Sequence, residues 1–181
     1  MSDLLARTAR AVPRAAIVLL VATAMPAATA RAQTNAVSAA DRTAIEQLLS
    51  QYNQALQSCS SKQYADLFTP DATFTSDDFR GARHRQLYGK SATLAGHDKL
   101  VELVETEEFC LNAEQRAARA SARPRVMSFT NLSLEPAANG IHGVLPLGNG
   151  GRYEDVYVKT AEGWKFKSRT VVMPPAPVQS K

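Results

Sequence analysis

Residues 41–74 constrain the fold of this chain more than any other segment. Apolar side chains in the first half recur three or four positions apart, the spacing that places them on one face of an α-helix. The residues on this face are Ile45, Leu48, Leu49, Tyr52, Ala55 and Leu56. Ser38 or Asp41 can cap the helix by accepting hydrogen bonds from its unpaired backbone N–H groups. The segment therefore predicts a long amphipathic helix that turns a tyrosine, Tyr52, toward the interior.

Two more elements are expected before residue 77. Residues 62–68 are predicted as a short second helix with Tyr64, Leu67 and Phe68 facing inward. Pro70 disfavours a helical conformation at the residue before it, so this helix is expected to end there. Residues 72–76 are predicted as a strand.

The rest of the chain changes from helical to extended patterns. Residues 77–96 are predicted as a long loop, with one helical turn, that lies over the mouth of a pocket. Residues 98–111 are predicted as a third helix and residues 112–124 as a loose segment. From residue 125 the apolar period approaches two, and strands are expected at residues 125–135, 141–147, 152–160 and 164–172. This order predicts an α+β fold, with three N-terminal helices packed on a strongly curved antiparallel sheet.

The first 32 residues have the layout of a secretory signal peptide. Three arginines precede a short apolar run at residues 15–25, and small residues surround the expected cleavage site after Ala32. The run is shorter than the ~20 residues that span a bilayer, so stable membrane insertion is not expected, and an uncleaved anchor is the alternative. We expect an exported protein, periplasmic or secreted. A flexible leader at residues 33–40, one domain at residues 41–172 and a disordered tail at residues 173–181 would follow.

Charge and side-chain spacing exclude several kinds of partner. Residues 1–32 carry four arginines and one aspartate, so their removal lowers the formal net charge from +4 to +1. No stripe of basic and aromatic residues is then left to follow a phosphate backbone, and nucleic acid is not an expected partner. The histidines His84, His97 and His142 are scattered, so neither a metal nor another cofactor is expected.

The two cysteines, Cys59 and Cys110, form an even count. In an exported chain an even count favours a disulfide, and two buried free thiols are the alternative.

Taken in order, these segments resemble the SnoaL-like domains of the nuclear transport factor 2-like superfamily. The resemblance covers residues 41–172 and is carried by the helix with Tyr52, YADLFTPDATF at residues 64–74, Gly96, Thr130-Asn131, and the hairpin GRYEDVYVKT–AEG–WKFKSR at residues 151–169. It implies a conical half-barrel, in which helices close a bent sheet around one pocket. The superfamily includes steroid isomerases, scytalone-type dehydratases, polyketide cyclases, dioxygenase small subunits and binding domains without chemistry. The resemblance therefore implies a pocket more firmly than a reaction.

The resemblance also implies which side chains line that pocket. The expected lining residues are Tyr52, Phe68, Phe74, Ser76, Met127, Asn131, Tyr153 and Asp155. Tyr52 matches an isomerase tyrosine that donates a hydrogen bond to a developing oxyanion, and a core tyrosine bonded to a backbone carbonyl is the alternative. The isomerase base position falls on Ser76 and the histidine common in SnoaL-like domains on Met127. Neither side chain transfers protons unaided.

Asp155 and His97 are the remaining candidates for acid–base chemistry, besides Tyr52. Tyr153, Asp155 and Tyr157 share one face of their strand, so Asp155 can face the pocket. The alternative for Asp155 is an ion pair with Arg169 on the neighbouring strand. His97 begins the third helix, where a surface position is expected, and His84 in the long loop can reach the pocket mouth.

We therefore expect a secreted domain that binds a small, largely apolar molecule without turning it over. One alternative is a cofactor-free lyase or isomerase, similar to a dehydratase or polyketide cyclase, that acts on a cyclic carbonyl compound. The resemblance implies a further alternative, an accessory module that forms a homodimer through its open sheet face.

Overall fold

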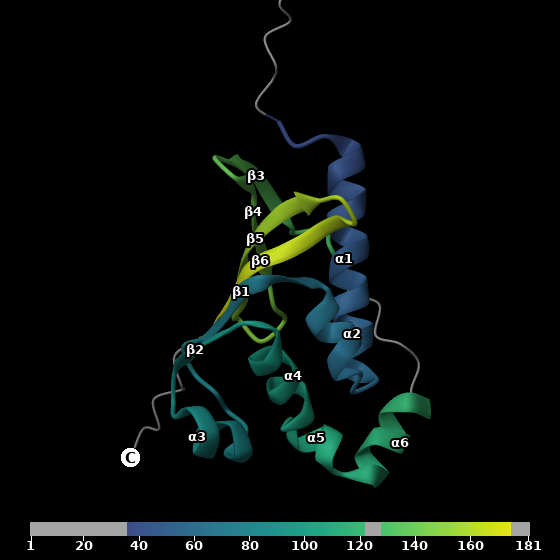
Figure 1. Ribbon diagram of the computed structural model, residues 1–181, viewed down its shortest axis with the longest axis vertical. Helices are drawn as coiled ribbons and strands as arrows, with labels where there is room; N and C mark the ends of the chain where they lie inside the picture. The colour runs from purple at the N-terminus through teal and green to yellow at the C-terminus, as the bar shows by residue number, and fades with distance from the viewer. Residues whose placement is uncertain (1–35, 122–127, 175–181) are drawn as a thin grey trace, which may run out of the picture. The chain divides into compact units, whose positions relative to one another are not determined.

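A six-stranded sheet is the framework of this protein, whose computed structural model describes residues 36–121 and 128–174 (Figure 1). The strands are β1 (Phe68–Ser76), β2 (Ala92–Ala95), β3 (Ser133–Ala137), β4 (Gly140–Pro146), β5 (Arg152–Thr160) and β6 (Gly163–Val172). They lie in the order β2-β1-β6-β5-β4-β3, and β1 and β6 are the one parallel pair. The expected α+β class, with helices packed on a curved and mostly antiparallel sheet, is confirmed.

Six helices accompany the sheet within the described residues. They are α1 (Ala39–Gln57), α2 (Ser61–Asp66), α3 (Ala82–Tyr88), α4 (His97–Glu105), α5 (Glu108–Leu111) and α6 (Ala113–Ser121). Ser38 caps α1, because its hydroxyl oxygen accepts a hydrogen bond from the backbone N–H of Asp41 at 3.0 Å. Helix α1 buries the apolar face that the sequence predicts, and it contacts β6 and α2. None of the described helices has the length and apolar character that a membrane span requires.

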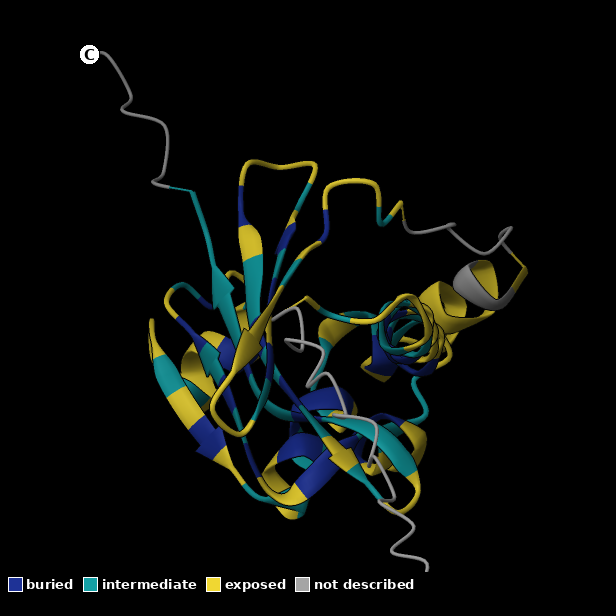
Figure 2. Ribbon diagram, turned by 90° about the horizontal axis from the view of Figure 1, so that it is seen from above, coloured by how far each residue is buried: buried dark blue, intermediate teal, exposed yellow. Residues whose placement is uncertain are grey.

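The interior is rich in aromatic rings. Tyr52, Tyr64 and Phe68 pack together with Phe166 of β6, and the Phe68 and Phe166 ring centroids lie 4.9 Å apart. Figure 2 shows buried residues concentrated along the strands and on the helix faces turned toward them. Offset and tilted ring pairs of this kind stabilise a core beyond the area that they bury.

The region predicted as a loop at residues 77–96 contains two regular elements. Helix α3 ends at Gly89, whose φ of 78° favours glycine, and β2 then pairs with β1 from Ala92 to Ala95. The prediction allowed for one helical turn here but missed the strand and the full length of the helix, because both elements are short. Helix α3 buries one side chain, His84, which is too few to produce a helical period.

Two other helical predictions were wrong in detail. The helix expected at residues 98–111 is interrupted at Thr106, whose hydroxyl donates to the Glu102 carbonyl at 2.7 Å, and Glu107 takes an extended conformation. The loose segment expected at residues 112–124 is α6 as far as Ser121. Asn112 precedes this helix, and its side-chain oxygen accepts from the Gln115 N–H at 3.0 Å, which satisfies one unpaired donor.

Strand boundaries also moved. Strand β1 begins at Phe68, within the predicted second helix, and its pairing with β6 is interrupted around Pro70, which has no N–H to donate. The strand expected at residues 125–135 begins only at Ser133, since residues 128–132 form a non-strand segment with a turn at Thr130 and Asn131. Residues 125–127 lie outside the described residues, as do the whole of the expected signal peptide, residues 33–35 of the expected leader and residues 175–181 of the expected tail.

The predicted disulfide between Cys59 and Cys110 is confirmed. It joins the turn between α1 and α2 to α5, with the two Cα atoms 5.5 Å apart. Since 51 positions separate the two cysteines, the bond closes a long loop and restricts the unfolded chain accordingly.

Replacing both cysteines, Cys59→Ser with Cys110→Ser, is expected to lower the free energy of unfolding by about 2–4 kcal/mol, because the unfolded chain regains the freedom that the closed loop removes. Urea denaturation of the oxidised wild type and of the double variant measures the difference. Adding a reductant should reproduce the loss in the wild type and have no effect on the double variant. Equal midpoints for the oxidised and reduced wild type would contradict this expectation.

Candidate functional site

A cavity of about 250 Å³ is lined by residues of the sheet, of the helices α1 to α4 and of the segments before α3 and α5. Its aromatic side is formed by Tyr52, Tyr64, Phe74, Phe79 and Tyr153. Its polar side includes Asp78, Arg80, His84 and Glu107. Pockets for drug-sized ligands usually measure roughly 300–1,000 Å³, so this cavity suits a smaller molecule.

The register of the central strands determines which side chains form the floor of the cavity. Tyr153 on β5 and Ser76 on β1 are both partners of Val171 on β6, and all three residues line the cavity. Registered partners point to the same face of a sheet, so this part of the floor is built by three adjacent strands. Two residues earlier in β6, and therefore on the same face of the sheet, Arg169 is in register with Phe74 and Asp155.

Arg169 and Asp155 form an ion pair beneath the cavity. Both side chains are completely buried, and the guanidinium donates from Nε and Nη2 to the two carboxylate oxygens at 2.8 and 2.7 Å. The Tyr157 hydroxyl donates to the same carboxylate at 2.7 Å. Gly143 leaves room for the Tyr157 ring, since a Cβ there would lie 2.5 Å from Cε2. Asp155 is thus held by three donors, as the ion-pair alternative anticipates, and it does not line the cavity.

The guanidinium of Arg169 also packs against aromatic rings. Its carbon lies 4.0 Å from the centroid of the Tyr52 ring, 4.1 Å from that of Tyr153 and 4.3 Å from that of Phe166. Burial is the largest influence and opposes the charge of Arg169, but the carboxylate of Asp155 together with Tyr52 and Tyr157 holds the pKa of the guanidinium well above its ordinary value. Arg169 therefore remains charged, and the rings receive a permanent cation.

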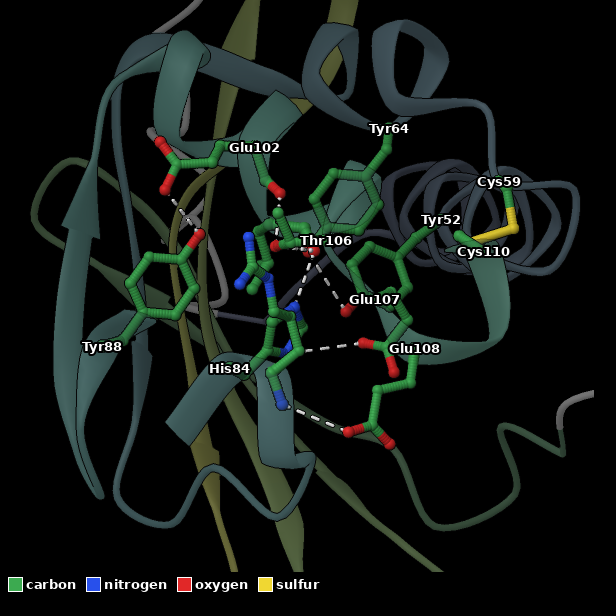
Figure 3. Close-up of polar contacts among 12 residues, drawn as sticks. Tyr52, Cys59, Tyr64, His84, Tyr88, Glu102, Thr106, Glu107, Glu108 and Cys110 are labelled. Carbon is green, nitrogen blue, oxygen red and sulfur yellow. Dashed lines mark hydrogen bonds and ion pairs between the residues drawn. A yellow bond between two sulfur atoms is a disulfide. The ribbon is translucent and has the colours of Figure 1, made fainter. Parts of the chain in front are cut away.

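Three tyrosine hydroxyls gather on the aromatic side. The Tyr64 hydroxyl donates to the Tyr52 hydroxyl at 3.4 Å (Figure 3). Burial, followed by the proximity of Tyr52, raises the pKa of Tyr64. The pKa of Tyr153 is raised first by Tyr52, because two phenolates would repel each other, and then by burial. Tyr64 and Tyr153 consequently stay protonated at neutral pH and contribute neutral hydroxyl groups to the site.

His84 and Glu107 form the clearest acid–base arrangement at the cavity. His84 is buried, and its Nε2 lies 2.9 Å from the Leu103 carbonyl oxygen, which can only accept, so Nε2 carries a proton. Its Nδ1 lies 3.6 Å from Glu107 Oε2 (Figure 3). A backbone carbonyl that fixes the tautomer leaves Nδ1 as the atom that gains or loses a proton.

The expected pocket residues are divided by the structure. Tyr52, Phe74, Ser76 and Tyr153 line the cavity, whereas Phe68 is buried in the aromatic core beside Tyr52 and Tyr64. Asn131 is exposed in the turn before β3, and Met127 lies outside the described residues.

Of the two histidines considered for acid–base chemistry, His84 lines the cavity and His97 does not. His97 is the first residue of α4 and is not among the residues that line the cavity. His84 and Glu107 do line it, and Glu107 was missed altogether. No periodicity marks either residue, because α3 has only seven residues and Glu107 precedes a helix of four, and the two side chains meet only through tertiary packing. No group of three or more His, Cys, Asp or Glu side chains within the described residues is arranged to hold a metal ion.

Comparison with known proteins identifies the family. A family model described as a SnoaL-like domain matches residues 37–170, and this chain therefore belongs to the SnoaL-like domains of the nuclear transport factor 2-like superfamily. A sequence comparison with curated proteins finds no match.

Solved structures show the same fold. One is a nuclear transport factor 2-like protein with a cystatin-like fold from Novosphingobium aromaticivorans, with a TM-score of 0.50 and 13% identity over 77% of this chain and 85% of that chain. Another is a protein of unknown function with a cystatin-like fold from Nostoc punctiforme, with a TM-score of 0.50 and 15% identity over 78% of this chain and 98% of that chain. At these identities the similarity establishes the fold alone.

Removing the buried carboxylate, Asp155→Ala, is expected to lower the free energy of unfolding by about 3–5 kcal/mol, because it leaves the Arg169 guanidinium buried without its counter-charge. Glu154→Ala is the matched control on the same strand. Its partner Arg152 is exposed, and such surface pairs contribute less than about 1 kcal/mol. Urea denaturation measures the free energy of unfolding of both variants. Similar losses in the two variants would contradict the expectation that the buried pair contributes more than the exposed one.

Proposed function

We propose that this domain binds a small, largely apolar cyclic molecule that carries a carbonyl oxygen, and that it does so without turning the molecule over. The observation that carries the proposal is the aromatic wall formed by Tyr52, Tyr64, Phe74 and Tyr153. Such a wall offers a ring a large apolar contact area together with a few hydroxyl groups. The carboxylate beneath it, Asp155, is fully engaged by Arg169 and Tyr157, so it is not free to abstract a proton.

Hydrogen-bond counting supports an acceptor on the ligand. Tyr64 donates to Tyr52 at 3.4 Å, so the Tyr64 proton is used within the site and the Tyr52 proton is left for another acceptor. Hydroxyls joined in a row use all but one of their protons on one another. No acceptor for the remaining proton is found among the described residues, and a carbonyl oxygen of the ligand would supply it.

The buried cation supports a neutral ligand over an amine. Arg169 already occupies positions against the rings of Tyr52 and Tyr153, within 4.1 Å of both centroids. A second cation in contact with the same rings would meet repulsion in a desolvated site. A carbonyl oxygen, which carries partial negative charge, is favoured at this end.

The Cys59–Cys110 disulfide is compatible with export. Disulfides persist in oxidising compartments and are rare where thiols are kept reduced. We propose on this basis that the domain acts in the periplasm or outside the cell.

A specific observation favours a second candidate, the cofactor-free lyase or isomerase. His84 and Glu107 face one another at the cavity, with the Nδ1 atom of His84 available for proton transfer. In this alternative His84 would remove a proton next to the ligand carbonyl while Tyr52 donates a hydrogen bond to the oxygen.

Acetophenone and α-methylstyrene form a matched pair of probes, since they differ chiefly in whether the ring bears C=O or C=CH₂. We expect Tyr52→Phe to weaken acetophenone binding about fivefold, the effect of losing one hydrogen bond of about 1 kcal/mol. Binding of α-methylstyrene should not change. Isothermal titration calorimetry or ligand-observed NMR gives both dissociation constants.

Tyr88→Phe is the control for this experiment. The Tyr88 hydroxyl donates to Glu102 at 3.0 Å, and Tyr88 does not line the cavity. The proposal fails if wild-type protein binds neither probe, or if Tyr52→Phe weakens both probes equally.

Turnover is tested separately by hydrogen–deuterium exchange of the acetophenone methyl group in D₂O, followed by NMR. We expect the wild-type protein to leave the exchange rate at the value in buffer. Acceleration that His84→Gln abolishes would replace the binding proposal with the lyase or isomerase. The glutamine keeps a donor for the Leu103 carbonyl but has no basic nitrogen, so it separates proton transfer from the structural role of His84.

A further inference from the structure

Helix α3 forms part of the cavity wall and is held there largely by side chains of other helices. It has seven residues and no side-chain cap of its own. The backbone N–H of Arg83, in its first turn, donates instead to Glu108 Oε1 at 3.1 Å. His84 in the next position bonds the Leu103 carbonyl and faces Glu107. Glu107, just before α5, thus contacts His84, and Glu108, the first residue of α5, holds Arg83.

Helix α5 is in turn held by the disulfide. It has four residues, Glu108–Leu111, and its third residue is Cys110. Cys110 is bonded to Cys59, which lies in the turn after α1 and adopts a left-handed backbone conformation with φ of 55°. Tyr52 of the cavity lies on α1, so the disulfide connects the helix that carries one wall to the segment that holds the opposite wall.

Figure 3 shows these contacts in one view. His84 points toward Glu107, and the Cys59–Cys110 bond lies on the other side of Tyr52 from His84. The covalent and polar contacts therefore form one continuous series from α1 through α5 to α3.

We infer that Glu107 and Glu108 are positioning residues for the cavity wall formed by α3, and that the Cys59–Cys110 disulfide controls ligand affinity by holding them in place. This inference deepens the proposed function and depends on it for the effect on ligand. When a dithiol reduces the bond, two electrons and two protons pass to the cysteines and the dithiol becomes a cyclic disulfide. α5 is then released, and α3 loses its cap at Arg83 and the contact of His84 with Glu107, so that of its bonds to other helices only those to α4 remain and the cavity opens.

The order of α3 is measured without any ligand by amide hydrogen–deuterium exchange with mass spectrometry. In Glu108→Ala, peptides covering residues 82–88 are expected to exchange about five to ten times faster than in wild type. Glu108→Gln should restore wild-type exchange, because its amide oxygen still accepts from the Arg83 N–H. Glu114→Ala, which removes an exposed glutamate from α6, is the charge-matched control and should leave α3 unchanged.

The disulfide is tested in the same way with the double variant Cys59→Ser and Cys110→Ser. Exchange is expected to rise in α3 and α5, while β5 and β6 keep their protection and show that the domain is folded. If this variant does not fold, the Glu108 pair decides. Unchanged α3 exchange in Glu108→Ala, or equal exchange in the Ala and Gln variants, overturns the inference. So does unchanged α3 exchange in a folded double variant.

Acetophenone affinity provides the second readout. Glu108→Ala and the folded double variant are expected to bind it about fivefold more weakly than the oxidised wild type, and Glu108→Gln within about twofold of it. Equal affinities would overturn the inference. If wild-type protein does not bind acetophenone, the proposed function fails, and the exchange experiment alone decides whether α5 positions α3.

Discussion

The buried contact between Arg169 and Asp155 organises the rest of this domain. Taking both charges out of water costs several kcal/mol for each ion, so the pair is tolerated only because its geometry is favourable. Two guanidinium N–H groups and the Tyr157 hydroxyl satisfy the carboxylate, and aromatic rings surround the cation. The pair fixes β5 against β6 from the inner face of the sheet. It also determines where Tyr52 and Tyr153 lie, and therefore the shape of the aromatic wall.

The two sides of the cavity are held by different forces. The aromatic wall consists of residues from α1, α2 and the central strands, where backbone ladders and ring packing limit movement. The polar side includes His84 of α3, a short helix attached through His84, Tyr88 and the cap on Arg83. The rigid aromatic wall can bind the ring of a ligand, and the less firmly held α3 can move to let the ligand enter. This arrangement suits binding, since entry requires one wall to open.

Sequence reasoning succeeded where the signal was local or strongly patterned. The buried face of α1 and the disulfide were predicted from spacing and composition, and the cap was narrowed to Ser38 or Asp41. The Asp155–Arg169 ion pair was one of two interpretations of this strand, because alternation alone put Asp155 inside without deciding between the ion pair and the pocket. Strand β2 and helix α6 were missed and α3 was expected only as a single turn, because β2 has four residues and the two helices are mostly polar or exposed, so no apolar period marks them.

The sequence by itself determined the class of fold, the helix that carries Tyr52 and the cysteines that are joined, because each depends on neighbouring residues or on composition. Tertiary structure decided the chemistry of the cavity. It paired Asp155 with Arg169 across two strands, left Asn131 in an exposed turn, and brought His84 to within 3.6 Å of Glu107 from another helix. Burial and charge pairing are properties of the space that several segments enclose together, and no single segment contains the information that fixes them.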